Sequence, residues 1–434
     1  MSRRINRRRF LIYGSATIGS SILLKACANS TPNATNSPAT SGNASPVAAS
    51  GGNTIKIGIL HSLSGTMSSV KNRCMGQIKY PGINAACGVL GKQIEPIVED
   101  GASNWDTFRE KATKLIDQDK VAVVFGCWTS ASRKNVKPVF ESKDHMLWYP
   151  VQYEGQECSK NIFYTGAAPN QQIEPSVDWL LKNKGKEFFL VGSDYVFPRT
   201  ANTIIKAQLE ALGGKTVGED YLPLGNTEVT PIISKIKQAL PNGGVIYNTL
   251  NGDSNVAFFK QLKGAGLTPD KHPSMSVSIA EEEVKAIGVE YLKGHYAAWN
   301  YFQTVDTPVI RNLSKLAKDM VQTRDKCPDE AAYIAVYLWK QSVEKAGSPD
   351  LAKVRAAAYG QTIDAPEGKV TVNTNHHISK IVRIGEVRDD GLFDIIYATP
   401  APVEPVPWNQ FVKETKGFAC DWSDPGKGEK YKKA

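Results

Sequence analysis

The sequence has few residues of the kinds that build metal centres and catalytic motifs. It contains six histidines among 434 residues, and none pair at the i, i+4 spacing with which a helix presents two ligands to zinc. The adjacent His376 and His377 would point in opposite directions on a strand. The chain also lacks a Gly-x-Ser-x-Gly elbow and a Gly-x-x-x-x-Gly-Lys-Ser/Thr loop. These absences argue against a metal centre, an elbow serine nucleophile and a phosphate-binding loop, and no cofactor is expected.

Long hydrophobic runs are also missing. The apolar stretch Phe10–Leu24 is about fifteen residues long and contains glycines and serines, so it is too short to span a bilayer stably. It follows the pair Arg7-Arg8 and precedes Ala26-Cys27, an arrangement typical of an export signal. Arg7-Arg8-x-Phe10-Leu11 resembles a twin-arginine signal, and Leu24-x-Ala26-Cys27 resembles a bacterial lipobox. We therefore expect residues 1–27 to direct export, Cys27 to carry a lipid, and the chain to work in the periplasm as a membrane-anchored lipoprotein.

The leader also lacks acidic residues, which explains the basic composition. It carries six of the positive charges, so the formal net charge of +9 falls to +3 for the mature chain. A nearly neutral chain gives no reason to expect a nucleic-acid partner. Residues 28–53 have no aromatic residue and no large aliphatic residue beyond Val47. Such a segment cannot bury enough surface to offset its ordering entropy, so we expect a flexible tether.

The rest of the chain alternates short apolar runs with helical patterns. Its roughly 380 residues exceed what one core usually holds, so two domains are expected. The expected strands are Ile55–Leu60, Val121–Phe125, Glu187–Val191 and Gly244–Tyr247. The expected helices are Trp105–Gln118, Thr200–Leu212, Val229–Leu240, Val256–Ala265 and Asp329–Ala346. This alternation predicts an α/β fold of two doubly wound parallel-sheet lobes with a ligand cleft between them.

The order of these segments predicts several crossings between the lobes. We expect lobe 1 to comprise residues 54–170 and 299–356, and lobe 2 to comprise residues 171–298 and 357–415. Residues 416–434 are expected to form a C-terminal tail. Ligands of open parallel sheets bind beyond the carboxyl ends of the strands. Two facing lobes would bring those ends to one cleft, where small-molecule pockets are common.

The residues that follow the expected strands are rich in aromatic rings beside hydroxyl groups or carboxylates. They occupy residues 125–134, 149–157, 192–199 and 248–255. Together with residues 57–66, 91–104 and 165–172, these stretches resemble solute-binding proteins of ABC importers in the family related to branched-chain amino acid receptors. The resemblance covers nearly all of residues 54–415 and is strongest to the urea and short-chain amide branch. It implies a type I periplasmic binding fold, delivery of the ligand to permease subunits in the membrane, and no catalysis.

The resemblance also implies ligand contacts. In related amide-binding proteins the ligand touches residues that match Trp128, Ser130, Tyr149, Tyr195 and Phe197. Val151 and Phe197 stand where some relatives have hydroxyl-bearing residues. Because both departures remove a polar contact, urea and a slightly more apolar amide remain alternatives.

The chemistry of urea adds three further candidates. Urea has four N–H donors and one acceptor oxygen, so its site needs several acceptors, a donor and flat walls. Glu154 and Asp253 can accept N–H bonds, Ser130 or a backbone N–H can donate to the oxygen, and Tyr153 can add a wall. As alternative roles, Glu154 could be a solvated turn acid, and Asp253 could favour the start of a helix.

Three other functions fit these residues less well. A branched-chain amino acid would need a cation for its carboxylate, and Arg133 and Arg199 lie past the strand ends, where helix or surface roles are expected. An amide-sensing regulator would have no use for the export signal. A periplasmic amide hydrolase would need a nucleophile next to a base, but Ser130 and Cys127 have no evident partner in the sequence.

Two local features complete the expectations. Cysteines in an exported protein can form disulfides, and the resemblance places Cys127 and Cys158 on neighbouring motifs, which makes them the first candidate pair. The alternative is two buried thiols.

The segment Met67–Ile83 contains Gly76, Pro81 and Gly82, so we expect no continuous helix there.

Overall fold

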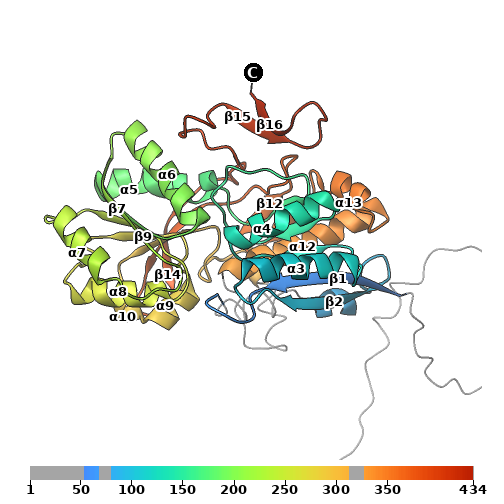
Figure 1. The fold of residues 1–434 in the computed structure, drawn as a ribbon, viewed down its shortest axis with the longest axis horizontal. Helices are drawn as coiled ribbons and strands as arrows, with labels where there is room; N and C mark the ends of the chain where they lie inside the picture. The colour runs from blue at the N-terminus through green and yellow to red at the C-terminus, as the bar shows by residue number, and fades with distance from the viewer. Residues whose placement is uncertain (1–52, 68–79, 312–326, 434) are drawn as a thin grey trace, which may run out of the picture. The chain divides into compact units, whose positions relative to one another are not determined.

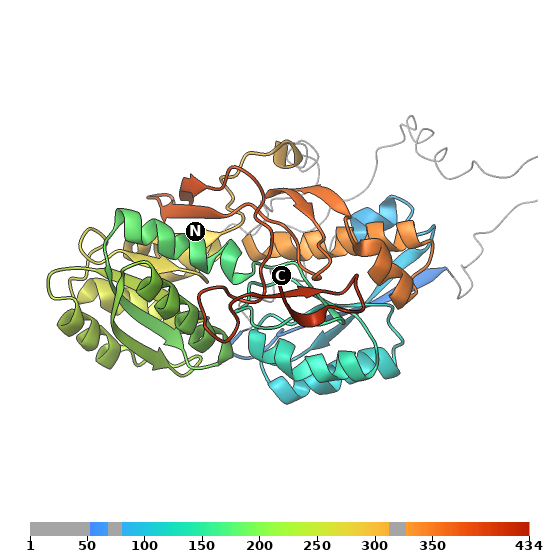
Figure 2. The ribbon, with the colours of Figure 1, turned by 90° about the horizontal axis from the view of Figure 1, so that it is seen from above.

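The computed structural model describes residues 53–67, 80–311 and 327–433 (Figures 1 and 2). Residues 52–434 form one compact unit. The export signal, Cys27 and the tether lie outside the described residues, as do residues 68–79 of the segment expected to lack a continuous helix. Helix α2 (Tyr80–Ala85) begins directly after that gap.

The first lobe is built on a five-stranded parallel sheet of strand order β2-β1-β3-β4-β5. Its strands are β1 (Thr54–His61), β2 (Gln93–Asp100), β3 (Val124–Gly126), β4 (Leu147–Tyr149) and β5 (Ile162–Tyr164). The apolar run expected as a strand from Val121 enters the sheet only at Val124. Since consecutive side chains on a strand point to opposite faces, Ile57 and Ile59 pack on one side of β1 and Leu60 on the other.

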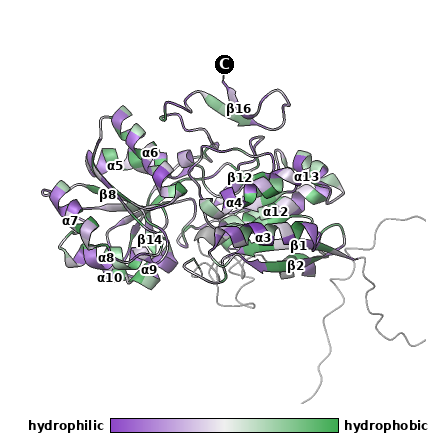
Figure 3. Cartoon of the chain, in the orientation of Figure 1, coloured by the Kyte–Doolittle hydropathy of each residue, from purple (hydrophilic) through white to green (hydrophobic). Residues whose placement is uncertain are grey.

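Helices cover both faces of this sheet. Helices α3 (Trp105–Asp117) and α4 (Ser130–Ser142) pack against one face. Helix α12 (Cys327–Ala346) and helix α13 (Leu351–Ala358) pack against the other. Figure 3 shows that the helices around the sheet carry both hydrophobic and hydrophilic residues, as amphipathic surface helices do.

The second lobe has a seven-stranded sheet of order β14-β13-β10-β9-β8-β6-β7, in which β13 and β14 are antiparallel additions. Its strands are β6 (Glu187–Ser193), β7 (Lys215–Leu222), β8 (Val245–Thr249), β9 (Ser274–Ser276), β10 (Tyr296–Trp299), β13 (Arg383–Val387) and β14 (Phe393–Ala398). Its helices are α5 (Ile173–Asn183), α6 (Val196–Ala211), α7 (Thr230–Ala239), α8 (Ser254–Gly264), α9 (Glu281–Ile287) and α10 (Val289–Leu292). Helices α5 and α6 pack on one face and α7 to α10 on the other. The expected doubly wound α/β architecture of both lobes is confirmed.

One segment joins a different lobe from the one expected. The hairpin of β11 (Thr362–Ala365) and β12 (Gly368–Thr371) packs its side chains into the core of lobe 1, beside α12. The return to the second sheet occurs at β13 rather than at residue 357. The expected boundary was wrong because Ala365 and Val370 find their apolar partners on α12 and not on the second sheet.

The C-terminal residues are structured and tied to the first lobe. Strands β15 (Phe418–Asp421) and β16 (Gly428–Lys432) form a hairpin, and Cys420 forms a disulfide with Cys158. Cys127 is a free, buried cysteine, so the expected Cys127–Cys158 pairing was wrong. Because Cys420 lies 262 residues from Cys158, no local pattern indicates this pairing. Among the described residues, no helix combines the length and hydrophobicity needed to cross a bilayer.

Candidate functional site

The candidate site begins at the sharp turn between β3 and α4. Gly126 has a φ of +150° and Cys127 a φ of +66°, and a Cβ on Gly126 would lie 2.0 Å from the carbonyl oxygen of Leu60. Only glycine fits so close to a neighbouring strand. The turn therefore places Trp128, Thr129 and Ser130 directly at the carboxyl end of the sheet.

Helix capping fixes the first turn of α4. The Thr129 hydroxyl accepts a hydrogen bond from the Ser132 amide at 3.0 Å, and the Ser132 hydroxyl accepts one from the Thr129 amide at 3.2 Å. This reciprocal arrangement satisfies two N–H groups that a helix start would otherwise leave unpaired. It holds Ser130, which is buried, in a defined position at the first helical residue.

A buried ionic cluster lies directly behind Ser130. The Arg133 guanidinium donates from Nη2 to Glu154 at 2.9 Å and from Nε to Glu157 at 2.8 Å. Its Nη1 donates to the Ser130 hydroxyl oxygen at 3.1 Å, and the Ser130 hydroxyl donates to Glu154. The side chain of Arg133 is 0% exposed, and those of Glu154 and Glu157 are 1% and 3% exposed. All three charges are therefore removed from solvent and depend on one another.

The pKa values in the cluster follow from this pairing. Burial opposes the charge of Glu157, but Arg133 and Lys134 hold the pKa of its carboxyl well below the usual range. Burial likewise opposes the charge of Arg133, yet Glu157 and Glu154 keep its pKa above the ordinary value. Lys134 adds a contact to Glu157 at 3.0 Å. Arg133 and Glu157 thus stay ionised around neutral pH.

Tyr149 supplies the incompletely paired polar atom of the site. Its ring is fully buried at the end of β4, with the Arg133 guanidinium carbon 4.9 Å from the ring centroid. Its hydroxyl is buried and has no partner at full hydrogen-bond geometry among the described residues, although the Ser130 side chain interacts with it. Burial also raises the pKa of this phenol above its ordinary value, so the hydroxyl keeps its proton. A desolvated hydroxyl without a full hydrogen bond is costly, and a ligand could supply that bond.

The second lobe approaches this site with two aromatic rings. Tyr195 precedes α6 and Phe197 lies in its first turn, with their ring centroids 6.4 Å apart. Tyr195 interacts electrostatically with Tyr149 and Glu154 of the first lobe. Helices α4 and α6 are in contact, and Leu224 of the second lobe packs against the core of the first. The lobes are thus closed on one another beside Ser130.

The structure gathers most of the residues expected at the site but gives several of them different surroundings. Trp128, Ser130, Tyr149 and Glu154 belong to one buried group, which Tyr195 approaches from the other lobe. The Ser130 hydroxyl proton and the Glu154 carboxylate, expected to serve the ligand, bind each other instead. In this arrangement, Ser130 offers a ligand its remaining lone pair rather than its proton.

Tyr153 and Asp253 have different surroundings from one another. The Tyr153 ring stacks on Tyr164 at 4.8 Å, and its hydroxyl donates to the Glu157 carbonyl at 3.0 Å and contacts His377 at 2.6 Å. The Tyr153 ring therefore packs against the Arg133 guanidinium. Asp253 is exposed at the start of α8 and its side chain makes no capping hydrogen bond.

Sequence reasoning missed the central role of Arg133 and Glu157. Arg133 was expected to have a helix or surface role, but it lies one helical turn after Ser130 and so shares its face of α4. Glu157 accepts from Arg133 and also from the Tyr164 hydroxyl at 2.8 Å. The i, i+3 spacing of Ser130 and Arg133 was the available signal.

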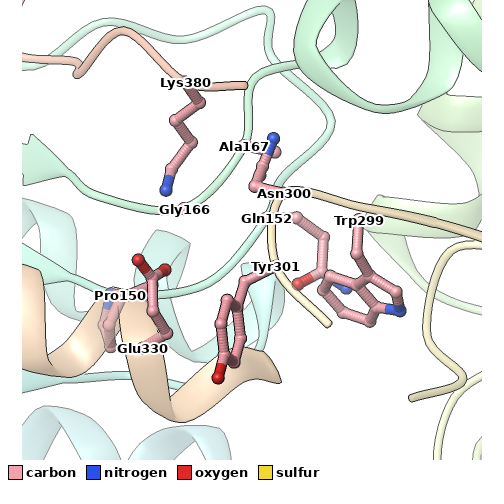
Figure 4. Close-up of a pocket in the computed structure, with 10 residues that line it drawn as sticks. Pro150, Gln152, Gly166, Ala167, Trp299, Asn300, Tyr301, Glu330 and Lys380 are labelled. Atoms are coloured by element: carbon pink, nitrogen blue, oxygen red, sulfur yellow. The ribbon is translucent and has the colours of Figure 1, made fainter. Parts of the chain in front are cut away.

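A small cavity lies where the chain crosses between the lobes (Figure 4). It has a free volume of about 20 Å³, and ten residues surround it: Pro150, Gln152, Gly166, Ala167, Trp299, Asn300, Tyr301, Glu330, Ala331 and Lys380. Figure 4 shows Lys380 and Glu330 facing the cavity from opposite sides, with Gln152 beside Trp299 and Tyr301. The described part of the chain contains no cluster of three His, Cys, Asp or Glu side chains suited to a metal ion.

Known proteins share this architecture. Residues 55–414 match the family model described as periplasmic binding protein domain. The leucine-, isoleucine-, valine-, threonine-, and alanine-binding protein of Pseudomonas aeruginosa is 24% identical over 329 residues, which cover 73% of this chain and 85% of that protein. A solute binding protein of an ABC transporter from Rhodopseudomonas palustris HaA2, solved in complex with p-hydroxybenzoic acid, superimposes with a TM-score of 0.73. It is 24% identical and covers 81% of this chain and 98% of its own, a likeness that shows the fold.

A shorter match involves an enzyme name. Limonene hydroxylase of Geobacillus stearothermophilus is 30% identical over 130 residues, which are 29% of this chain and 24% of that protein. This chain spans only about a quarter of the length of that enzyme. The match therefore gives no reason to assign a hydroxylase activity to this chain.

Proposed function

The chain belongs to the periplasmic binding protein domain family, and we propose that it is the solute-binding receptor of an ABC importer whose solute is urea or a short-chain amide. The receptor would bind this solute between Ser130 and Tyr149 of the first lobe and Tyr195 and Phe197 of the second. It would then deliver the solute to permease subunits in the membrane. No catalytic step is part of this proposal.

The observation that carries the proposal is the pairing of Arg133 with two buried carboxylates. Its guanidinium binds Glu154 at 2.9 Å and Glu157 at 2.8 Å in a site closed to solvent. A ligand carboxylate would have to compete with both residues for this cation, and it would add a third negative charge to the cluster. A neutral ligand avoids that cost.

The remaining polar atoms complement an amide. The Tyr149 hydroxyl has no partner at full hydrogen-bond geometry and can donate to a ligand carbonyl oxygen. The Ser130 oxygen, already bonded to Arg133 and Glu154, keeps one lone pair for a ligand N–H. Trp128 and Phe197 are buried aromatic side chains that can pack against a flat ligand.

Calorimetry tests the proposal directly. The chain is titrated with urea, acetamide, leucine and 4-hydroxybenzoate, and heat is expected for urea or acetamide only. Binding of leucine alone would replace the amide assignment by the amino-acid alternative, which the name of the Pseudomonas relative favours. Ammonia released in proportion to the protein would instead support the hydrolase alternative.

We also propose that Cys27 carries a lipid that anchors the receptor at the periplasmic face of the membrane. The support is the sequence Leu24-x-Ala26-Cys27 behind an export signal. Metabolic labelling with a fatty acid should mark the wild-type chain, and Cys27→Ala should release it in soluble form. An unlabelled wild-type chain would refute the anchor without affecting the ligand proposal.

A further inference from the structure

Gln152 connects the ligand-facing loop of the first lobe to the second lobe. It follows β4 in the same loop as Tyr149 and Glu154, and its side-chain Nε2 donates to the carbonyl oxygen of Val277 at 2.9 Å. Val277 directly follows β9 of the second sheet. This hydrogen bond therefore joins the two lobes beside the segments in which the chain crosses between them.

The backbone behind Gln152 is held in place. A Cβ on Gly166 would lie 1.9 Å from the carbonyl carbon of Val151 and 2.4 Å from the amide nitrogen of Gln152. The next residue, Tyr153, donates its backbone N–H to the Ala167 carbonyl at 3.1 Å. Because the loop is packed this tightly, Gln152 cannot shift independently of the Tyr149 end of the loop.

Only half of the Gln152 amide is satisfied in the closed lobes. Its Oε1 is buried without a hydrogen-bond partner among the described residues, and the side chain borders the cavity that also contains Lys380 and Glu330 (Figure 4). On closure, Nε2 thus gains one hydrogen bond to the second lobe. Oε1 loses its hydrogen bonds to water and gains no protein partner in exchange. The contact therefore favours the closed lobes only modestly, so it does not lock them in the absence of ligand.

Gln172 supplies an internal comparison. Its Nε2 donates to the same Val277 carbonyl at 3.3 Å and to the Ala298 carbonyl at 2.7 Å. Gln172 begins α5, a helix of the second lobe, so both of its hydrogen bonds stay within that lobe. Two glutamines thus share one acceptor, but of these two only Gln152 joins the first lobe to the second.

We propose that Gln152 is a positioning residue that couples the ligand-facing loop to lobe closure through its hydrogen bond to Val277. This inference rests on the proposed function as a receptor that closes on its solute. The residue does not need to touch the solute. It slows ligand release by holding the lobes together after the solute has entered.

The test uses the full chain and compares Gln152→Met with Gln172→Met. Stopped-flow tryptophan fluorescence with urea should show a dissociation rate about tenfold faster for Gln152→Met, with an unchanged association rate, as expected when one interlobe hydrogen bond is lost. The melting temperature of the ligand-free variant should stay close to wild type. Gln172→Met should lower the melting temperature and leave the dissociation rate unchanged.

A second measurement does not require urea. Fluorescence labels on cysteines introduced at Leu90 of lobe 1 and Leu212 of lobe 2, both exposed, report the closed fraction of single ligand-free molecules. This fraction should fall in Gln152→Met and in the shorter Gln152→Asn, which keeps the amide but cannot reach Val277. An unchanged closed fraction, or a wild-type dissociation rate, would overturn the proposal. Absence of any urea signal from the wild type would refute the urea assignment alone, since the closed fraction still tests Gln152.

Discussion

The guanidinium carbon of Arg133 lies 4.9 Å from the ring centroid of Tyr149, so a cation paired with two carboxylates lies next to a phenol that lacks such a partner. The cation packs against this ring, and the ring centroid of a second tyrosine, Tyr153, lies 4.8 Å from the same guanidinium carbon. The ion pairs of Arg133 with Glu154 and Glu157, here called the charged layer, therefore fix the positions of the side chains around Tyr149. Under the proposed function, the Tyr149 hydroxyl serves the ligand.

The first prediction concerns the stability of the charged layer. Arg133→Met leaves Glu154 and Glu157 buried without their cation, so the free energy of unfolding should fall by about 3–5 kcal/mol. Guanidinium chloride is the denaturant of choice, since urea is the proposed ligand. The control is Arg199→Met, which removes an exposed ion pair with Asp194 and should cost no more than about 1 kcal/mol. Equal effects of the two variants would contradict the structural role of the buried cluster.

The second prediction separates ligand binding from stability. Tyr149→Phe removes a hydroxyl that has no partner at full hydrogen-bond geometry in the ligand-free site, so the melting temperature should stay the same or rise slightly. Urea affinity should fall by about 1–2 kcal/mol, because the ligand oxygen loses a donor. Tyr247→Phe is the matched control: its buried hydroxyl bonds to Ser176 at 2.7 Å, so this variant should lose stability and keep its affinity. An unchanged affinity of Tyr149→Phe would remove this residue from the proposed contacts.

Local patterns in the sequence predicted the elements that depend on local causes. The helix expected over Trp105–Gln118 is observed as α3, and Asn104 caps it by accepting from the amides of Asp106 and Thr107. The apolar run in β6 has the expected signature of a strand buried on both faces. In both cases, residues within a few positions of each other determine the structure.

The features that the sequence did not reveal depend on distant partners. Arg133 carries the same charge whether it lies on a surface or in a core, and only the fold brings Glu154 and Glu157 to it. The Cys158–Cys420 pairing likewise depends on the path of the C-terminal hairpin. Periodicity reports which side of an element is buried but not which element covers it.

The third prediction concerns this disulfide. Cys420→Ser should lower the free energy of unfolding by about 2–4 kcal/mol, because the bond closes a loop of 262 residues in the unfolded chain. Dithiothreitol should destabilise the wild type more than Cys420→Ser, which keeps the disulfide of Cys87 but has no bond left to lose at Cys158. Burial raises the pKa of the Cys127 thiol to about 12, so this cysteine should react with iodoacetamide only after unfolding. A peptide map that links Cys127 to Cys158 would contradict the assigned pairing.

The last prediction uses Glu174, a half-buried carboxyl group of α5 that contacts Asn409 of the C-terminal segment. Burial raises the pKa of Glu174 to about 7, and a hydrogen bond from the Asn409 side chain at 2.6 Å opposes this shift only in part. In the unfolded chain the same group titrates near 4.5. Between these two values the folded state holds more protons than the unfolded state, so this group makes the free energy of unfolding fall as the pH rises from about 4.5 to about 7.

Glu174→Gln should remove that part of the pH dependence, because glutamine keeps the shape of the side chain and does not ionise. Its melting temperature should resemble that of the wild type near pH 4.5 and exceed it above pH 7, where the wild-type carboxyl must carry a buried charge. Differential scanning calorimetry across this range measures the difference between the two curves. Parallel curves would mean that the carboxyl titrates at the same pH in both states, and they would contradict its burial beneath Asn409. A difference that grows with pH would show that the C-terminal segment keeps Glu174 out of solvent.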